Sequence, residues 1–182
     1  MNKTIINAIQ LIKGDHRVVD GLFSKFKVAS TPAERKTLAN QIVKELSVHA
    51  AIEEEVLYPA IRKAISGQVA DHCIDEHQKL KELLYDIDQM NGDHPQFVTK
   101  MNTVIQETTH HVKEEEESIL PKFQSKVSPK ELEELGSQLQ SAKAHAPTRP
   151  HPMAPNKPPL NIPLNMGTAP IDKLRDAAEG RK

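Results

Sequence analysis

The sequence contains two copies of one pattern of histidine, glutamate and proline, 62 residues apart. The first copy is His49-x-x-x-Glu53 with Pro59, and the second aligns with it without a gap, as His111-x-x-x-Glu115 with Pro121. A lone histidine precedes each copy, His16 by 33 residues and His77 by 34. An internal repeat of this length predicts that two similar structural units pack together and complete one core.

Four stretches carry apolar residues at the spacing of an amphipathic helix. The stripes are Ile5, Ile9, Ile12, Val19, Phe23 and Phe26; Leu38, Ile42, Leu46, Ile52, Val56 and Ala60; Ala70, Cys73, Leu80, Leu84 and Ile87; and Phe97, Met101, Val104, Thr108, Ile119 and Phe123. Aromatic residues make up only 3% of the chain, which disfavours a β-sandwich. We therefore predict an all-α, up-down-up-down four-helix bundle made of two repeated helical hairpins.

Local signals mark where the helices begin and end. Thr31-Pro32-Ala33-Glu34 has the pattern of a helix N-terminus with a capping box, and Asn91–Pro95 ends one helix before the next begins. Ser128-Pro129-Lys130-Glu131 repeats the start signal and predicts a short fifth helix to about Lys143. The bundle and this helix are expected to occupy residues 1–144.

Prolines crowd the chain after Ala144, where large apolar residues become sparse. We interpret residues 145–182 as an extended Pro-rich C-terminal tail, with a helical turn or two from Ile171 to Glu179.

Six polar residues interrupt the apolar stripes and are therefore expected to point into the core: His16, His49, Glu53, His77, His111 and Glu115. Burying an ionised carboxylate costs several kcal/mol unless it is paired, and a metal ion removes that cost. Residues four apart on a helix share one face, so an imidazole can hold one metal ion while the carboxylate reaches a second. Imidazole with carboxylate suits iron or manganese, and zinc stays open.

Other histidines fall outside this pattern. His110 points about 100° away from His111 on a helix, so we expect it on the surface. His72, His94, His145 and His151 lie off the stripes or in loops, and we do not expect them to be ligands.

Charge and cysteine content exclude some classes of protein. The formal net charge is −1, so the basic excess of a nucleic-acid-binding protein is missing. No apolar run approaches the roughly 20 residues that span a bilayer. A single cysteine, Cys73, cannot form an internal disulfide. We expect a cytoplasmic protein that binds neither nucleic acid nor membrane.

These motifs resemble the hemerythrin-like proteins with a His-His-Glu cation-binding domain, including bacterial members. The resemblance covers about residues 4–126 and rests on Asp15-His16, Glu76-His77, and the two His-x-x-x-Glu-Glu copies with their Leu-Tyr-Pro and Leu-Pro endings. It implies a non-haem centre of two solvent-bridged iron ions, with His16, His49, His77 and His111 as terminal ligands and Glu53 and Glu115 as bridges. A monomer or weak homodimer is expected.

One position departs from the oxygen-carrying members of that family. They have a fifth histidine one turn before the residue matching His77, where this chain has Cys73. The resemblance then implies an open position on both irons, which favours reactive chemistry over reversible oxygen carriage. Cys73, Glu54 or Glu116 could each add a ligand, and Asp15 and Glu76 or backbone carbonyls are expected to orient the imidazoles.

The expected partner is therefore a small molecule: hydrogen peroxide, O2 or NO. The first functional hypothesis is catalase-like disposal of hydrogen peroxide by a di-iron centre. The alternatives are a module that binds or senses oxygen or nitric oxide, or binds iron, without turnover, and a structural bundle whose histidines bind nothing.

Overall fold

The computed structural model describes residues 7–181, so Ile5 of the first stripe lies outside it. All the regular elements in this range are helical, which confirms the all-α class, and none of these residues lies in a β-strand. The elements are α1 (Ala8–Val28), α2 (Pro32–Ile52), η1 (Glu53–Leu57), α3 (Tyr58–Ala64), α4 (Gly67–Gln89), α5 (Phe97–Glu114), η2 (Glu115–Ile119), α6 (Leu120–Gln124), α7 (Pro129–His145) and α8 (Asn161–Ala178). No described helix is both long and apolar enough to cross a membrane.

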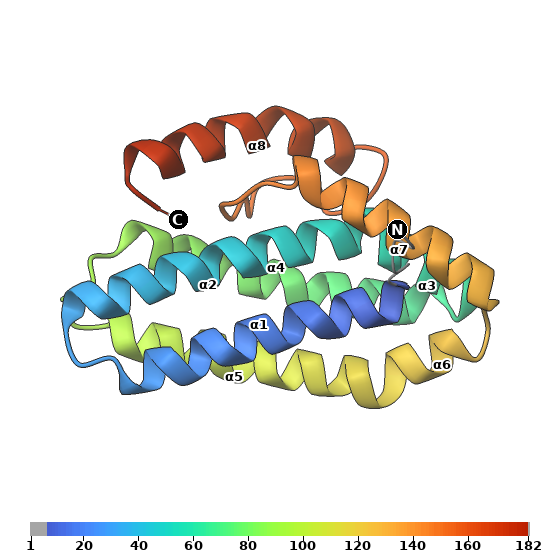
Figure 1. The fold of residues 1–182 in the computed structure, drawn as a ribbon, viewed down its shortest axis with the longest axis horizontal. Coiled ribbons are helices and arrows are strands. Elements are labelled where there is room, and N and C mark those ends of the chain that lie inside the picture. Colours follow the sequence, from blue (N-terminus) through green and yellow to red (C-terminus); the bar gives the residue numbers. More distant parts are fainter. Residues whose placement is uncertain (1–6, 182) are drawn as a thin grey trace, which may run out of the picture.

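The long helices lie side by side, and successive ones run in opposite directions (Figure 1). Helix α1 packs against α2, α2 against α4, and α4 against α5. Helix α7 crosses one end of this bundle and packs on α1, α2 and η1.

The predicted start signals are confirmed. Thr31 and Ser128 each cap a helix, and Glu34 and Glu131 complete the two capping boxes. Each box satisfies backbone N–H groups that the first helical turn leaves without partners. The short fifth helix is α7.

Two separate apolar clusters fill the bundle, one at each end. The first includes Ile12, Ile52, Ile74 and Ile119, and the second includes Val19, Leu46, Leu80 and Val104. Each of the four stripe histidines lies, in the sequence, between a residue of one cluster and a residue of the other. The core is therefore divided by a layer of polar side chains at mid-height.

The expectation of an extended tail is wrong for its last part, because Asn161–Ala178 form helix α8. Helix α8 packs on α7 and lies along the outside of the bundle (Figure 1). Its buried residues are mostly polar: Asn161, Asn165, Ala169, Asp172 and Asp176. Most of its large apolar residues are exposed instead: Leu164, Met166, Ile171 and Leu174. A search for apolar stripes cannot find a helix that turns its polar face inward.

Arg149 fastens this C-terminal segment to the bundle. Its side chain is 3% exposed, and its guanidinium donates to Asp88 at 3.2 Å, to Asp176 at 2.9 Å and to Glu179 at 2.6 Å. Asp88 belongs to α4, whereas the other two carboxylates lie in or just after α8. Arg181 also pairs with Asp88, at 2.5 Å, so two buried arginines join the end of α4 to the C-terminal segment.

We expect Arg149→Ala to weaken the docking of α8 by about 3–5 kcal/mol, because it leaves the buried carboxylate of Asp176 without its cation. The rate of proteolytic cleavage between residues 146 and 160 measures this docking. Arg175→Ala is the matched control, since Arg175 is an exposed arginine of the same helix. Equal cleavage rates in the two variants would contradict the role of Arg149.

Candidate metal centre

All six predicted core residues come together in the polar layer, where they form two overlapping donor groups. His16, His49, Glu53 and Glu115 each offer a ligand atom within 4.8 Å of the others, and all four are buried. Glu53 forms a second such group with His77 and His111. Glu53 thus belongs to both groups, as a bridging carboxylate must.

Each hairpin supplies the histidines of one group. Glu53 Oε2 lies 3.2 Å from His49 Nε2 of its own hairpin and 3.4 Å from His77 Nε2 of the other. Glu115 reaches in the opposite direction, with its Oε2 3.3 Å from His16 Nε2. The two carboxylates therefore cross between the hairpins. Glu115 lies in the first group only, so its bridging role stays a prediction.

Both carboxylates begin a π-helical turn, η1 at Glu53 and η2 at Glu115. In each turn a backbone N–H bonds five residues back, from Tyr58 to Glu53 and from Leu120 to Glu115. A proline follows each of these donors. Proline lacks an N–H, and its ring clashes with the carbonyl four residues back, so widening the preceding turn relieves the clash.

An outer carboxylate accompanies every histidine. Measured from Nδ1 to the nearest carboxylate oxygen, the pairs are His16 with Glu116 at 2.8 Å, His49 with Asp15 at 3.7 Å, His77 with Glu54 at 3.2 Å and His111 with Glu76 at 2.8 Å. A carboxylate on the δ nitrogen orients the ring and leaves the ε nitrogen to face a metal ion. The expected roles of Asp15 and Glu76 fit this geometry. Glu54 and Glu116, which the sequence left open as ligands, occupy the same kind of position.

Three of these outer carboxylates are held in turn by a basic side chain. Lys143 donates to Asp15 at 2.6 Å, and Lys81 donates to Glu54 at 2.6 Å. Arg17 donates to Glu116. Going outward from the donor groups, each of these three imidazoles is followed by a carboxylate, and each carboxylate is followed by a lysine or an arginine. Only Lys143 lies in α7, and the sequence pattern gave no sign that it would reach Asp15.

Tyr58 is a buried member of the site that the repeat pattern did not predict. Its hydroxyl donates to Glu53 Oε2 at 3.1 Å and lies 3.0 Å from His77 Nε2 and 3.3 Å from His111 Nε2. The corresponding residue of the second copy is Leu120. The phenol therefore makes the second donor group chemically different from the first. The sequence signal was its place in the Leu57-Tyr58-Pro59 ending of the first copy, which carries part of the family resemblance but did not assign the phenol a role.

Several inward-facing atoms have no hydrogen-bond partner among the described residues. They are His16 Nε2, His49 Nε2, Glu53 Oε1, and both carboxylate oxygens of Glu115. A buried polar atom without a partner costs about 1–3 kcal/mol, and more when it is charged. Cations coordinated by these nitrogens and oxygens would satisfy them, so the residues present fit a metal centre.

The surrounding protein groups shift the pKa values of the two carboxylates, Glu53 and Glu115, in opposite directions. Burial and the charge of Glu115 raise the pKa of Glu53. Burial also opposes ionisation of Glu115, but the close approach of His16, with its Nε2 3.3 Å away, and the charges of nearby histidines outweigh it and lower that pKa to about 2. Burial lowers the pKa of His77, so this imidazole is neutral and its nitrogen lone pair is free to bind a metal ion.

Cys73 is fully buried in the apolar cluster at the α7 end and belongs to neither donor group. Burial and the neighbouring glutamates raise the pKa of its thiol, so it stays protonated. His110 is exposed, as expected, and so is His94. His145 pairs with Glu55, and His151 pairs with Asp172.

A small hollow lies against all four histidines. Its other walls are mainly apolar: Val19, Leu46, Ala50, Leu80 and Val112. Thr108 completes it, and the Thr108 hydroxyl, on a residue only 3% exposed, has no hydrogen-bond partner in the described structure. This hollow can admit only a small molecule beside the donor groups.

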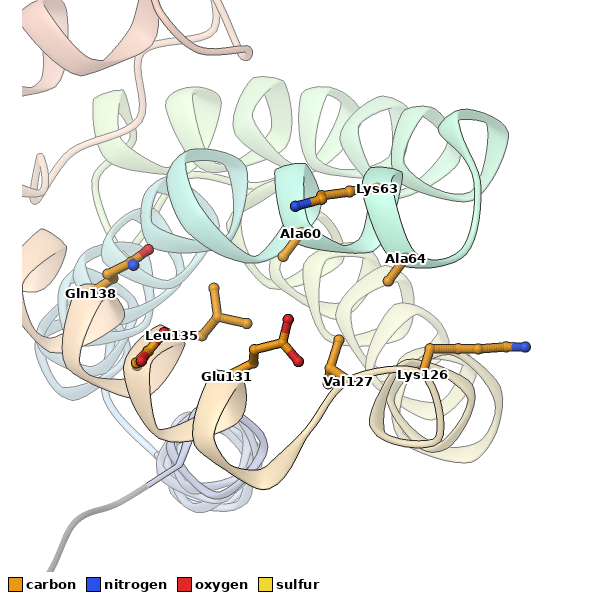
Figure 2. A pocket seen from close by; sticks show the side chains of 9 residues that line it. Ala60, Lys63, Ala64, Lys126, Val127, Glu131, Leu135 and Gln138 are labelled. Carbon is orange, nitrogen blue, oxygen red and sulfur yellow. The ribbon is translucent and has the colours of Figure 1, made fainter.

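A second hollow lies elsewhere, between α3 and the start of α7 (Figure 2). Its lining includes Ala60, Ala64, Val127 and Leu135, and it contains no histidine. Its labelled acid, Glu131, already accepts hydrogen bonds from Ser128 in a capping box. This hollow offers no comparable metal chemistry.

Comparison with known proteins supports the same region. The family described as the Hemerythrin HHE cation binding domain matches residues 7–123. A crystal structure of a hemerythrin HHE cation binding domain-containing protein from Mycobacterium kansasii superimposes with a TM-score of 0.67 at 26% identity. That match covers 76% of this chain and 86% of the other.

Two relatives show how widely the sequence is related. An uncharacterized hemerythrin-like protein of Schizosaccharomyces pombe is 33% identical over 91% of this chain and 83% of its own length. A protein of Nostoc named DNA nickase is 27% identical over 79% of this chain, but the match covers only 41% of that longer protein.

We expect His111→Ala to lower the metal content of the purified protein, because it removes a nitrogen from the second donor group. His110→Ala is the matched control, since it removes the adjacent, exposed histidine. Elemental analysis of both variants measures the effect. If both retain as much metal as the wild type, His111 is not a ligand.

Removing metal with a chelator is expected to lower the thermal unfolding temperature. A ligand that binds only the folded state stabilises it by about 2.7 kcal/mol at a hundredfold excess over its dissociation constant. Differential scanning calorimetry of metal-loaded and chelated protein gives the comparison. The same unfolding temperature for both would show that no cation offsets the buried charge.

Proposed function

The chain belongs to the hemerythrin HHE cation-binding family, and we propose that it holds two iron ions in the polar layer and uses them to dispose of hydrogen peroxide. The observation that carries this proposal is the pair of donor groups that share Glu53. His16 and His49 would hold one iron, and His77 and His111 the other. Glu53 and Glu115 would lie between them. The donor groups contain no thiolate, which is consistent with iron in an imidazole and carboxylate site.

The proposed reaction converts two molecules of hydrogen peroxide into two of water and one of O2. A bound iron pair supplies a two-electron exchange, so that one peroxide is oxidised to O2 while the other is reduced to water. The protein supplies the geometry around it. The outer carboxylates fix the imidazoles, and the apolar walls of the hollow beside the histidines limit access of bulk water.

Thr108 is suited to position the substrate. Thr108 lines the hollow beside the histidines, and its buried hydroxyl has no hydrogen-bond partner among the described residues. A hydroxyl can both donate and accept, and so it can bind either end of a peroxide molecule. Tyr58 can hold a proton on the opposite side, because burial and the charges of Glu53 and Glu115 raise the pKa of its phenol.

Binding of O2 or NO without turnover is the second candidate, and the small size of the hollow accommodates those molecules too. The presence of Cys73 in place of a fifth histidine favours turnover, since each iron would keep an open position. We do not propose DNA nicking, the activity in the name of the Nostoc relative, for this chain. Its net charge of −1 leaves it without the basic excess that binds the DNA backbone. Its single, buried cysteine is consistent with a cytoplasmic location.

Iron-loaded protein is expected to release O2 steadily from hydrogen peroxide, as followed with an oxygen electrode. Glu53→Ala should abolish this release by removing the shared ligand. Thr108→Val should keep its iron but lower kcat/KM at least about tenfold, the usual loss when a hydrogen bond of roughly 1.4 kcal/mol is removed. Valine preserves the shape of the side chain.

Free iron at the same concentration is the control for the wild type. Turnover no faster than free iron would contradict the proposed reaction. A stable spectral change with O2 or NO that reverses on removal of the gas, in protein that does not consume peroxide, would select the binding function instead.

A further inference from the structure

A third cluster of possible metal ligands lies on the surface beside the centre. His72 Nε2 is 3.3 Å from Glu114 Oε2 and 3.6 Å from Glu76 Oε1, and the three ligand atoms lie within 4.8 Å of one another. His72 and Glu76 come from α4, and Glu114 ends α5. Unlike the buried groups, this cluster is open to solvent, with side-chain exposures of 51% for His72, 19% for Glu76 and 38% for Glu114.

The spacing of this cluster matches that of the buried ligands. His72-x-x-x-Glu76 repeats the His-x-x-x-Glu arrangement of the two internal copies, which puts imidazole and carboxylate on one face of α4. The sequence analysis set His72 aside because it lies off the apolar stripe, and the structure agrees that it is not in the core. Because His72 and Glu76 lie outside the apolar stripe of α4, the same His-x-x-x-Glu spacing places this imidazole and carboxylate at the surface.

Glu76 connects the cluster to the buried centre. Its Oε2 lies 2.8 Å from His111 Nδ1, while its Oε1 faces His72. One carboxylate thus contacts a histidine of the centre with one oxygen and a surface histidine with the other. A cation held at the surface would be one residue away from the second donor group.

The charge balance around Glu76 also indicates a missing cation. The other three outer carboxylates each pair with a lysine or arginine: Asp15 with Lys143, Glu54 with Lys81, and Glu116 with Arg17. In residues 7–181, no lysine or arginine lies within ion-pair distance of Glu76 or Glu114. Glu76 contacts His111 at 2.8 Å and His72 at 3.6 Å, and Glu114 contacts His72 at 3.3 Å. On the outer side, the two carboxylates therefore share the imidazole of His72, where each of the other outer carboxylates has a lysine or an arginine.

We propose that His72, Glu76 and Glu114 form a third, solvent-accessible site for a divalent metal ion, from which the buried centre is filled. The proposal rests on the proposed function, because it requires a buried centre to fill. The buried donors are at most 6% exposed, so an arriving ion needs a first binding place outside them. A weak surface site next to Glu76 raises the local concentration of metal at His111.

Zn(II) is the probe, because it binds the same donors and undergoes no redox change. Calorimetric titration of the metal-free wild type is expected to show two tight equivalents and one weaker equivalent per chain. His72→Ala and Glu114→Gln should each weaken the third equivalent about tenfold or more, the order of loss seen when groups that support a metal site are removed. His94→Ala, at an exposed histidine remote in sequence, should keep all three.

The rate of filling tests the role of the site. Zn(II) transferred from a chelating dye, at less than saturating concentration, should fill the buried centre about tenfold more slowly in His72→Ala and in Glu114→Gln than in wild type and His94→Ala. The final number of tightly bound ions should be the same in all four proteins, because none of these changes removes a buried ligand.

The outcomes separate this proposal from the proposed function. A wild type that takes up no tight Zn(II) contradicts the dinuclear centre itself. Two tight equivalents without a third weaker one, or a third equivalent that survives both substitutions, would overturn the surface site. Equal filling rates in all four proteins would overturn its role in supplying the centre.

Discussion

The whole structure depends on keeping six polar side chains, two of them fully buried glutamates, in the middle of an apolar bundle. Burying such a layer away from water destabilises the folded state unless every polar group has a hydrogen-bond partner or a counter-charge. The chain meets this demand from the outside inward. Basic side chains hold most of the outer carboxylates, those carboxylates hold the imidazoles, and the ε nitrogens and inner oxygens are left facing one another. That inner surface is complete only with cations.

The layer also explains the division of the core. Apolar residues above and below it form separate clusters, each closed by a different set of loops and helices. Helix α7 covers one end, and its Lys143 reaches Asp15 in the layer. The two hairpins are similar but not equivalent, since Tyr58 has only Leu120 as its counterpart. This difference gives one side of the centre a proton that the other side lacks.

Much of this arrangement could be predicted from the sequence, because it depends on local rules. The helix starts at Thr31 and Ser128 are set by side chains three residues apart, and the six buried donors follow from the helical period. Features that depend on contacts between residues far apart in the sequence could not be predicted from these local rules. Glu54 and Glu116 lie one residue off the stripe, and only the widened turns and the neighbouring helices show that they support histidines. Helix α8 was not predicted because its buried face is polar. The buried arginine that stabilises this face, Arg149, leaves no periodic pattern in the sequence.

The supporting contacts of the centre extend beyond the region that the family shares. The family match ends at residue 123, yet Lys143 holds Asp15, and Asn156 accepts a hydrogen bond from the same Lys81 that holds Glu54. Two imidazoles are thus steadied by residues of the chain's final third. A shortened chain that ends at residue 123 would retain all six buried donors but lose Lys143 and Asn156, so the segment that supports the centre extends beyond the family match.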